Sequence, residues 1–465
     1  MRKSILLLFI LSLFITQNTS AQTNISTKIN ELITKQLPSS SEVGISVYNL
    51  STQREVYNYN GNKLSRPAST LKLITAITAL ERKVEPFETS LWYNGVIKNN
   101  ILYGDIYVVG GFDPEFDESS MDQLVSKINS LPIEKISGNI YGDVSLKDSL
   151  YWGKGWAWDD NPNSYQPYLS PLMYNKGMVT VTASPTQTGS PASVSIKPES
   201  SYYSLENRSI SSMPSADKFK VTRDWMNNQN TIYVLGNVDR TRRININMHN
   251  ASLFFMHTLY EKIIKSGIQI EGVYDLKTLE INDESTELAT IKRPLIEVLQ
   301  EMLKESDNLN AEALLHHIGK EKKAKHIGAE EGLLYVDSLI LKMGHLPQKY
   351  RIVDGSGLSA YNAISPDLLV SFLKYSYTNK PIYNVLQETL PVAGIDGTLS
   401  YRMKNTKAYK NVKAKTGTIT LISGLAGYAK NSKGELLAFA ILNQNILKGS
   451  QARQFQNDVC QLLCE

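Results

Sequence analysis

Hydrophobic residues recur at two different spacings along this chain, and these spacings predict its elements. A first set lies three to four positions apart, as on one face of a helix: Ile25, Ile29, Leu32, Ile33 and Leu37. Val43, Ile45 and Val47 then alternate as in a half-buried strand, and residues 55–60 return after a short polar turn. A second helix is predicted from Thr70 to about Lys83. The N-terminal part therefore reads as a helix, a β-hairpin and another helix.

The C-terminal part has the same kinds of elements. Residues 422–445 read as two strands around a Lys433-Gly434 turn, and a helix is expected from about Ser450. Terminal helices that bracket antiparallel strands favour an α+β fold, in which helices flank an antiparallel sheet built from both chain ends.

The middle of the chain has a different pattern. Between residues 86 and 288, short alternating segments, Gly/Asp turns and aromatic residues predict a β-rich insertion. Stretches rich in Pro, Ser and Asn favour a further module nested around residues 175–243. Residues 22–85 and 289–465 would then form one domain around this insertion.

The first residues have the pattern of a cleaved signal peptide, expected over residues 1–21. Arg2 and Lys3 precede an apolar run from Ile5 to Ile15, and small residues follow up to Ala21. The run is shorter than the roughly 20 residues of a bilayer-spanning helix. We therefore expect an exported protein with at most peripheral membrane association.

Composition narrows the partners further. The chain has 49 basic and 45 acidic residues and a formal net charge of +4, which gives no basis for nucleic-acid binding. Its two cysteines, Cys460 and Cys464, match neither a zinc spacing nor a Cys-x-x-Cys redox motif, and whether they are bridged stays open. No His-Glu-x-x-His motif or cysteine cluster occurs, so neither a metal nor another cofactor is expected.

Ser69 and Lys72 are the first candidates for chemistry. They lie three positions apart where the second helix begins, so the hydroxyl and the amine share one helix face. A serine hydroxyl becomes a nucleophile when a nearby base takes its proton, and a lysine kept neutral can be that base. Ser-x-x-Lys also occurs at Ser215–Lys218 and Ser371–Lys374, and by itself Ser69 fits a helix N-cap better.

Two further short motifs carry polar groups. Ser306-Asp307-Asn308 follows an apolar helical run, although such residues usually cap helices or form turns, as we read Ser137-Gly138-Asn139. Lys415-Thr416-Gly417-Thr418 opens a strand, where Gly417 lets another backbone approach closely. Lys265-Ser266-Gly267 is similar but fits a helix end with a glycine cap.

The order of the three motifs is more specific than any one of them. Ser-x-x-Lys, Ser-x-Asn and Lys-Thr-Gly in this order are the signature of penicillin-binding proteins and serine β-lactamases. The 237 residues from Ser69 to Ser306, with the segments RPASTLKLITA, GGFDPEF, DGSGLS and LPVAGIDGTLSYRM, resemble the class C low-molecular-mass penicillin-binding proteins. These are D-alanyl-D-alanine carboxypeptidase/endopeptidases of the bacterial envelope. Ala360 follows DGSGLS where the family is expected to have arginine.

The resemblance implies a fold and a set of roles. The fold is a transpeptidase domain, like that of serine β-lactamases, with a large β-rich insertion of one or two smaller domains. Ser69 is then the acyl-accepting nucleophile and Lys72 its general base. Ser306 and Asn308 would shuttle a proton and contact the substrate amide, while Lys415 would favour a neutral Lys72 and attract a carboxylate.

The resemblance also implies substrate contacts. The backbone N–H groups of Ser69 and Thr418 would form an oxyanion hole. Thr416 and Thr418, on either side of Gly417, would hold the terminal carboxylate, and the strand edge would pair with the peptide. GWAWDD resembles a segment whose acid faces the cleft, which makes Asp160 a candidate for the free amine of a diamino acid; a solvated turn acid is the alternative.

We therefore expect a serine D-alanyl-D-alanine carboxypeptidase, with endopeptidase activity, in the bacterial periplasm or cell envelope. Its expected partners are peptidoglycan stem peptides, and β-lactam antibiotics as covalent inhibitors. One alternative is a serine β-lactamase, although no Glu-x-x-Leu-Asn segment is present; another is a catalytically idle peptidoglycan-binding protein. The diamino acid of the stem, the balance of the two activities and the oligomeric state stay open.

Overall fold

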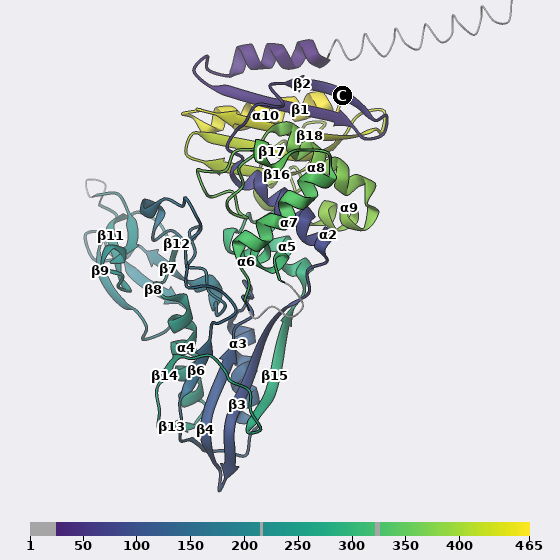
Figure 1. The fold of residues 1–465 in the computed structure, drawn as a ribbon. Coiled ribbons are helices and arrows are strands. Elements are labelled where there is room, and N and C mark those ends of the chain that lie inside the picture. The colour runs from purple at the N-terminus through teal and green to yellow at the C-terminus, as the bar shows by residue number, and fades with distance from the viewer. Residues whose placement is uncertain (1–24, 214–216, 321–325) are drawn as a thin grey trace, which may run out of the picture. The chain divides into compact units, whose positions relative to one another are not determined.

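The computed structural model describes residues 25–213, 217–320 and 326–465, which form two compact units (Figure 1). The first unit contains the described residues up to Lys83, Leu299–Asp307 and Leu333–Glu465, and the second contains Val84–Val298 and Asn308–Gly332. The signal peptide expected over residues 1–21 and Ser215 of one Ser-x-x-Lys motif lie outside the described residues. The domain boundaries expected from the sequence stay a prediction.

One five-stranded antiparallel sheet organises the first unit, and it joins the two ends of the chain (Figure 1). Its strands, in spatial order, are β16 (Lys413–Ile419), β17 (Ile422–Lys430), β18 (Leu436–Gln444), β1 (Glu42–Asn49) and β2 (Arg54–Tyr59). In the register, Ile45 lies opposite Ile441 and Val47 lies opposite Phe439. The alternation of apolar residues in the sequence therefore corresponds to a real inward face.

Helices lie on both faces of this sheet. Besides a helix over residues 25–36, the labelled helices of this unit are α2 (Lys72–Arg82), α5 (Leu295–Lys304), α7 (Ala329–Lys342), α8 (Pro366–Thr378), α9 (Lys380–Thr389) and α10 (Gly449–Leu463). Of these, α5 and α7 begin in the second unit. The helix over residues 25–36 and α10 bury Ile29 and Phe455 with Ile45 of β1. Gly44 points to the opposite face, where a Cβ would contact Pro366 of α8. The sheet is thus covered on both sides, with α2 packed against α8.

The described residues of the second unit form three sheets. The largest contains β13 (Gln269–Ile270), β5 (Lys135–Ile136), β4 (Ile101–Val109), β3 (Phe87–Lys98) and β15 (Ser285–Arg293) in that order, with β6 (Ile140–Asp143) paired to β4 and β14 (Tyr274–Leu276) paired to β6. Two three-stranded sheets have the orders β12-β7-β8 and β10-β11-β9. Their strands are β7 (Met178–Ser184), β8 (Ser193–Lys197), β9 (Ser204–Ser211), β10 (Lys220–Arg223), β11 (Thr231–Val238) and β12 (Arg242–Asn247). This unit is β-rich, as the sequence pattern predicted.

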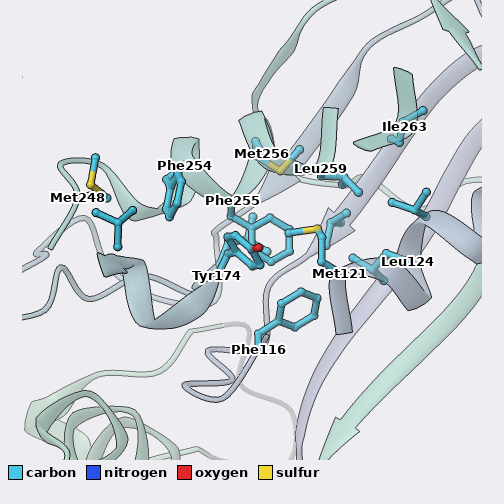
Figure 2. Close-up of a cluster of buried hydrophobic side chains, with 14 of the residues drawn as sticks. Phe116, Met121, Leu124, Tyr174, Met248, Phe254, Phe255, Met256, Leu259 and Ile263 are labelled. Atoms are coloured by element: carbon cyan, nitrogen blue, oxygen red, sulfur yellow. The ribbon is translucent and has the colours of Figure 1, made fainter. Parts of the chain in front are cut away.

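Two helices of this unit were not predicted by the strand pattern. These are α3 (Glu118–Asn129) and α4 (Ala251–Lys265), and their inward side chains form a buried cluster with Phe116 and Tyr174 (Figure 2). The signal for α3 was present in the sequence, because Met121 and Leu124 lie at helical spacing and Asp117 accepts a hydrogen bond from Ser120 N as the N-cap. Each large apolar side chain buried in this way stabilises the fold by roughly 1.5–3 kcal/mol.

Two separate helices flank the Ser306-Asp307-Asn308 motif, which follows an apolar helical run in the sequence. α5 ends at Lys304 and α6 (Asn308–Ile318) begins at Asn308, while Ser306 between them has a φ of 65°. A left-handed residue of this kind ends a helix, because the chain can no longer continue the helical hydrogen bonds. No helix among the described residues is both long and apolar enough to cross a bilayer.

Two buried histidines of α6 should make the stability of the second unit depend on pH. His316 donates from Nδ1 to the Glu312 carbonyl, and His317 donates from Nε2 to the Gly111 carbonyl, at 2.8 and 2.9 Å. Burial lowers the pKa of His316 to about 4 and that of His317 to about 3. Above pH 6.5 both rings are neutral in the folded and unfolded chain, so they impose no penalty. Between pH 6.5 and about 4, the unfolded chain binds protons that the folded chain refuses, and stability falls.

We expect each buried histidine to lower the free energy of unfolding by about 2 kcal/mol between pH 7.5 and pH 5. Urea unfolding curves at the two pH values measure this loss. His317→Gln keeps an amide donor for Gly111 and should show a smaller pH-dependent loss than the wild type. His326→Gln is the matched control, because His326 is exposed. An unchanged pH dependence in His317→Gln would contradict the assignment.

Candidate active site

Ser69 lies in a single 3-10 turn, Ala68–Leu71, that leads directly into α2. Neither helix start has a side-chain cap, so the N-cap interpretation of Ser69 is wrong. Its hydroxyl instead accepts a hydrogen bond from Lys72 Nζ at 2.8 Å. Ala68, just before it, has a φ of 47°, a conformation that costs an ordinary L-residue about 1–2 kcal/mol. Backbone strain of this kind concentrates at functional sites.

Lys72 is fully buried, with 0% of its surface exposed. Besides Ser69, its Nζ donates to the Ser356 carbonyl at 2.8 Å. The loop that carries this carbonyl is fixed by the buried Asp354, whose carboxylate accepts from Gly357 N and Ser359 N. The DGSGLS segment was noted in the sequence, but its contact with Lys72 was not predicted.

Lys415 brings the other two motifs of the first unit together. It lies on β16 with 0% of its surface exposed, and its Nζ donates to Ser306 Oγ at 2.7 Å and to the Thr416 carbonyl at 3.0 Å. The left-handed conformation of Ser306 is what ends the preceding helical segment beside this strand. Four residues from three distant parts of the sequence thus form two lysine–serine pairs in one unit.

The two lysines influence one another electrostatically. Burial lowers the pKa of Lys415 well below its usual range, and the positive charge of Lys72 lowers it further, whereas Glu305 opposes these effects. Two ammonium groups this close in a buried site are unfavourable, because each disfavours the charged form of the other. Lys415 can therefore lose its proton more easily than an exposed lysine.

The strand β16 forms one edge of the sheet and presents two threonines. The Thr416 hydroxyl donates to Thr398 Oγ1 at 2.8 Å, whereas Thr418 is exposed and lies opposite Ser423 of β17. A strand edge next to a lysine–serine centre can receive an extended peptide.

The family assignment follows from the whole chain. The sequence pattern of the D-Ala-D-Ala carboxypeptidase 3 (S13) family matches residues 25–465. The chain belongs to this family. It is a serine-type D-Ala-D-Ala carboxypeptidase, a peptidase of the hydrolase class.

Individual relatives agree with this assignment over most of their length. The D-alanyl-D-alanine carboxypeptidase DacB of Haemophilus influenzae is 28% identical over 451 residues, which are 93% of this chain and 90% of the relative. The crystal structure of penicillin binding protein 4 from the same organism matches with a TM-score of 0.82 and 26% identity, over 93% of this chain and 98% of the other. The predicted family, α+β fold and enzyme class are thereby confirmed.

Asn308 and Asp160 of this carboxypeptidase lie in its second unit, where Tyr165 connects them. Asn308 Nδ2 donates to the Tyr165 carbonyl at 2.7 Å, and the Tyr165 hydroxyl donates to Asp160 Oδ1 at 2.8 Å. Burial and the Asp160 carboxylate together raise the pKa of Tyr165 to about 12, so it stays a donor at neutral pH. Tyr165 was not predicted, and the only sequence signal was its place five positions after Asp160.

Three glycines leave the space that the Ser69 turn occupies. A Cβ on Gly417 would lie 2.8 Å from the Pro67 carbonyl oxygen and 3.1 Å from Ser69 N. A Cβ on Gly424 would lie 2.9 Å from Thr70 Cγ2, and one on Gly357 would overlap the Ala68 carbonyl. The predicted close approach at Gly417 is thus observed, and the approaching backbone belongs to Ser69 itself.

Gly417→Ala should therefore impair this carboxypeptidase even though only one methyl group is added. We expect the rate of D-Ala release to fall by about 10–100-fold because the turn must shift, and a 1 Å misplacement can cost this much. The free energy of unfolding should fall by about 1–3 kcal/mol. Gly449→Ala, at the start of α10, is the matched control, since its Cβ would meet only the end of the Arg453 side chain. A Gly417→Ala enzyme with wild-type kinetics would show that the turn tolerates displacement.

The competing motifs of the carboxypeptidase have ordinary structural contacts. Ser371 and Lys374 both lie on α8, where the Ser371 hydroxyl donates to the Asp367 carbonyl and Lys374 Nζ lies 3.7 Å from the Tyr48 ring centre. Ser266-Gly267 ends α4 as predicted, with a φ of 101° at Gly267. Sequence order, rather than any single motif, separated the candidate site from these positions.

The described part of the chain contains no group of three or more His, Cys, Asp and Glu side chains placed to hold a metal ion. Cys460 in α10 and Cys464, which directly follows this helix, are buried free thiols, and burial raises the pKa of both. The bridge that the sequence left open is thus not formed in this structure.

Proposed function

We propose that this carboxypeptidase removes the terminal D-Ala of peptidoglycan stem peptides through an acyl-Ser69 intermediate. The observation that carries the proposal is the 2.8 Å hydrogen bond between Lys72 Nζ and the Ser69 hydroxyl, at a lysine with no exposed surface. A serine next to a lysine that can become neutral has both the nucleophile and the base that acyl transfer needs.

In the acylation step, neutral Lys72 accepts the Ser69 proton while Oγ attacks the carbonyl carbon of the penultimate D-Ala. The oxygen of that carbonyl becomes negative, and backbone N–H groups of Ser69 and Thr418 are the proposed donors to it. When the C–N bond breaks, a proton passes by way of Lys72 and Ser306 to the leaving amine of the terminal D-Ala. Water then hydrolyses the ester and restores the Ser69 hydroxyl.

The substrate decides which lysine of the pair is charged. Lys415 in the free enzyme has a lowered pKa because it is buried beside Lys72. The terminal carboxylate, held by the Thr416 and Thr418 hydroxyls, would bring a negative charge to Lys415 and stabilise its charged form. Lys72 would then remain the neutral member of the pair when acylation begins.

We further propose an endopeptidase activity and covalent inhibition by β-lactams. A cross-link is also a D-Ala amide, so the same Ser69 chemistry applies when the leaving amine belongs to another stem. Penicillin binding protein 4 of Haemophilus influenzae, at 24% identity and a TM-score of 0.76, has been crystallised as a complex with a β-lactam. The strained ring of a β-lactam offers Ser69 a more reactive amide.

A further proposal concerns recognition of the substrate. Asp160, held by Tyr165, supplies a negative charge for the free amine of the stem diamino acid. Asp160→Asn should then raise KM for stem peptides with a free amine more than for N-acetylated ones, and equal effects on both would refute this role.

Residues 1–21 are proposed to direct export of the enzyme to the periplasm or cell envelope. Cell fractionation of the full-length chain and of a chain without these residues tests this proposal.

Mass spectrometry of muropeptides incubated with the enzyme tests the proposal as a whole. Uncross-linked pentapeptides should lose one alanine, and cross-linked dimers should separate into monomers. A serine β-lactamase would instead hydrolyse a cephalosporin over many turnovers and leave the pentapeptide intact. A peptidoglycan-binding protein without catalysis would retain the muropeptides unchanged.

A further inference from the structure

An ion pair connects the end of α5, which precedes Ser306, with a loop near β16. Lys304 Nζ lies 2.6 Å from Asp396 Oδ2, and both residues belong to the first unit. The other oxygen of Asp396 accepts a hydrogen bond from Val392 N at 2.8 Å, which closes the loop on itself. At Gly397, which has a φ of 52°, a Cβ would lie 2.5 Å from the Lys304 carbonyl oxygen. The loop therefore packs closely against the residue two positions before Ser306.

The same loop is also bonded to β16. Ala414 N donates to the Pro391 carbonyl at 3.0 Å, and Val392 forms a β-bridge with Lys413. At the other end of the loop, Thr398 Oγ1 accepts the hydrogen bond from the Thr416 hydroxyl at 2.8 Å. These bonds lie on both sides of Lys415 along the strand.

We infer that Asp396 and Thr398 are positioning residues for the candidate active site. Asp396 acts through Lys304 to hold the Ser306 turn at hydrogen-bond distance from Lys415. Thr398 acts through its contact with Thr416, one of the two residues proposed to hold the substrate carboxylate: when the carboxylate is bound, the hydrogen bond reverses, so that the Thr398 hydroxyl donates to Thr416 Oγ1 and the single hydrogen of Thr416 is donated to the carboxylate. This inference rests on the proposed function, since it assigns these residues to the same acyl transfer.

The Lys304–Asp396 ion pair is expected to matter more for catalysis than for the stability of the fold. The side chains of Lys304 and Asp396 are 21% and 41% exposed, and ion pairs with such access to water contribute little to folding, at most about 1 kcal/mol. Acyl transfer, in contrast, depends steeply on distance, because a displacement of about 1 Å can cost 10²-fold in rate. Loss of the pair should therefore reduce catalysis much more than stability.

Asp396→Asn, Lys304→Met and the double variant test the role of the ion pair. We expect each single variant to acylate with fluorescent penicillin about 10–100-fold more slowly, while noncovalent affinity stays within about twofold. The double variant should be no slower than the single ones, because both remove the same interaction. Lys135→Met is the control, since it breaks the partly exposed ion pair with Glu271 in the second unit. It should acylate at the wild-type rate.

Thr398→Val and Thr398→Ser test the second contact. The valine variant should lose preference for a peptide ending in a free carboxylate over its C-terminal amide, and the serine variant, which keeps a hydroxyl, should retain it. Wild-type acylation by Asp396→Asn, additive losses in the double variant, or an equal loss in Lys135→Met would overturn the role of Asp396. An unchanged preference in Thr398→Val would overturn that of Thr398.

Should Asp396→Asn not fold, Asp396→Glu replaces it, because glutamate keeps the charge but shifts its position by one methylene group. A rate like that of the wild type would then count against a positioning role. Failure of the proposed function has a different signature, because the wild-type protein itself would not be labelled at Ser69.

Discussion

Ser69→Ala should abolish both covalent labelling by fluorescent penicillin and the release of D-Ala. The fall should be at least about 10⁴-fold, because removal of a nucleophile leaves only the binding and oxyanion contributions of the site. The variant should remain folded, since the Ser69 side chain caps neither helix start. Gel fluorescence after penicillin labelling and mass spectrometry of peptide products measure the two losses.

Ser371→Ala is the matched control for this experiment. Ser371 has the same Ser-x-x-Lys spacing, but it lies on α8 and its hydroxyl donates to the Asp367 carbonyl. We expect labelling by penicillin at the wild-type level. Undiminished labelling of Ser69→Ala would instead show that another residue carries the acyl group.

The sequence predicted which residues of the first unit come together better than it predicted their local geometry. Ser69, Lys72, Ser306 and Lys415 were chosen from three short motifs, and the structure places them as two hydrogen-bonded pairs. Their order along the chain was the decisive signal, because other copies of each motif have equivalent local sequences. The alternative interpretation of Ser69 as an N-cap, which fits the local sequence by itself, is wrong because neither helix start has a side-chain cap.

Contacts made through backbone atoms could not be predicted. The Ser356 carbonyl accepts from Lys72, and any residue type can supply a carbonyl. What the sequence does record is the requirement for space, since Gly357 and Gly417 both lack the Cβ that would collide with the Ser69 turn. The glycines therefore indicate which segments pack against the Ser69 turn, whereas the identity of the residue at position 356 does not indicate that its carbonyl contacts Lys72.

β1 was predicted because its large apolar side chains lie on only one of its two covered faces. β1 alternates because Ile45 and Val47 face one layer of helices and Gly44 faces the other. The end of the helical run before Ser306 was noted in the sequence, whereas the left-handed conformation of Ser306 itself was not predicted. The helices α3 and α4 of the β-rich unit were not predicted, because strand patterns surround them in the sequence. The start of α3 nevertheless has an N-cap, Asp117.

Lys72→Met should slow acylation by penicillin by about 10³-fold, which is within the range that one general base contributes. Methionine fills a similar volume without a proton-accepting amine, so the buried position remains occupied. The substitution removes the hydrogen bonds to Ser69 and to the Ser356 carbonyl, both 2.8 Å long. Stopped-flow fluorescence over a range of penicillin concentrations separates the acylation rate constant from the noncovalent affinity.

Lys72→Arg distinguishes a base from a positive charge at this position. Arginine keeps the charge but stays protonated, with a pKa above 12, so it should not restore acylation. Lys374→Met on α8 is the control for loss of a Ser-x-x-Lys lysine, because Lys374 contacts the Tyr48 ring and not a serine nucleophile. Restoration by arginine would show that Lys72 acts as a fixed charge and that the proton of Ser69 leaves by another route, for which Lys415, joined to Ser306, is the remaining candidate.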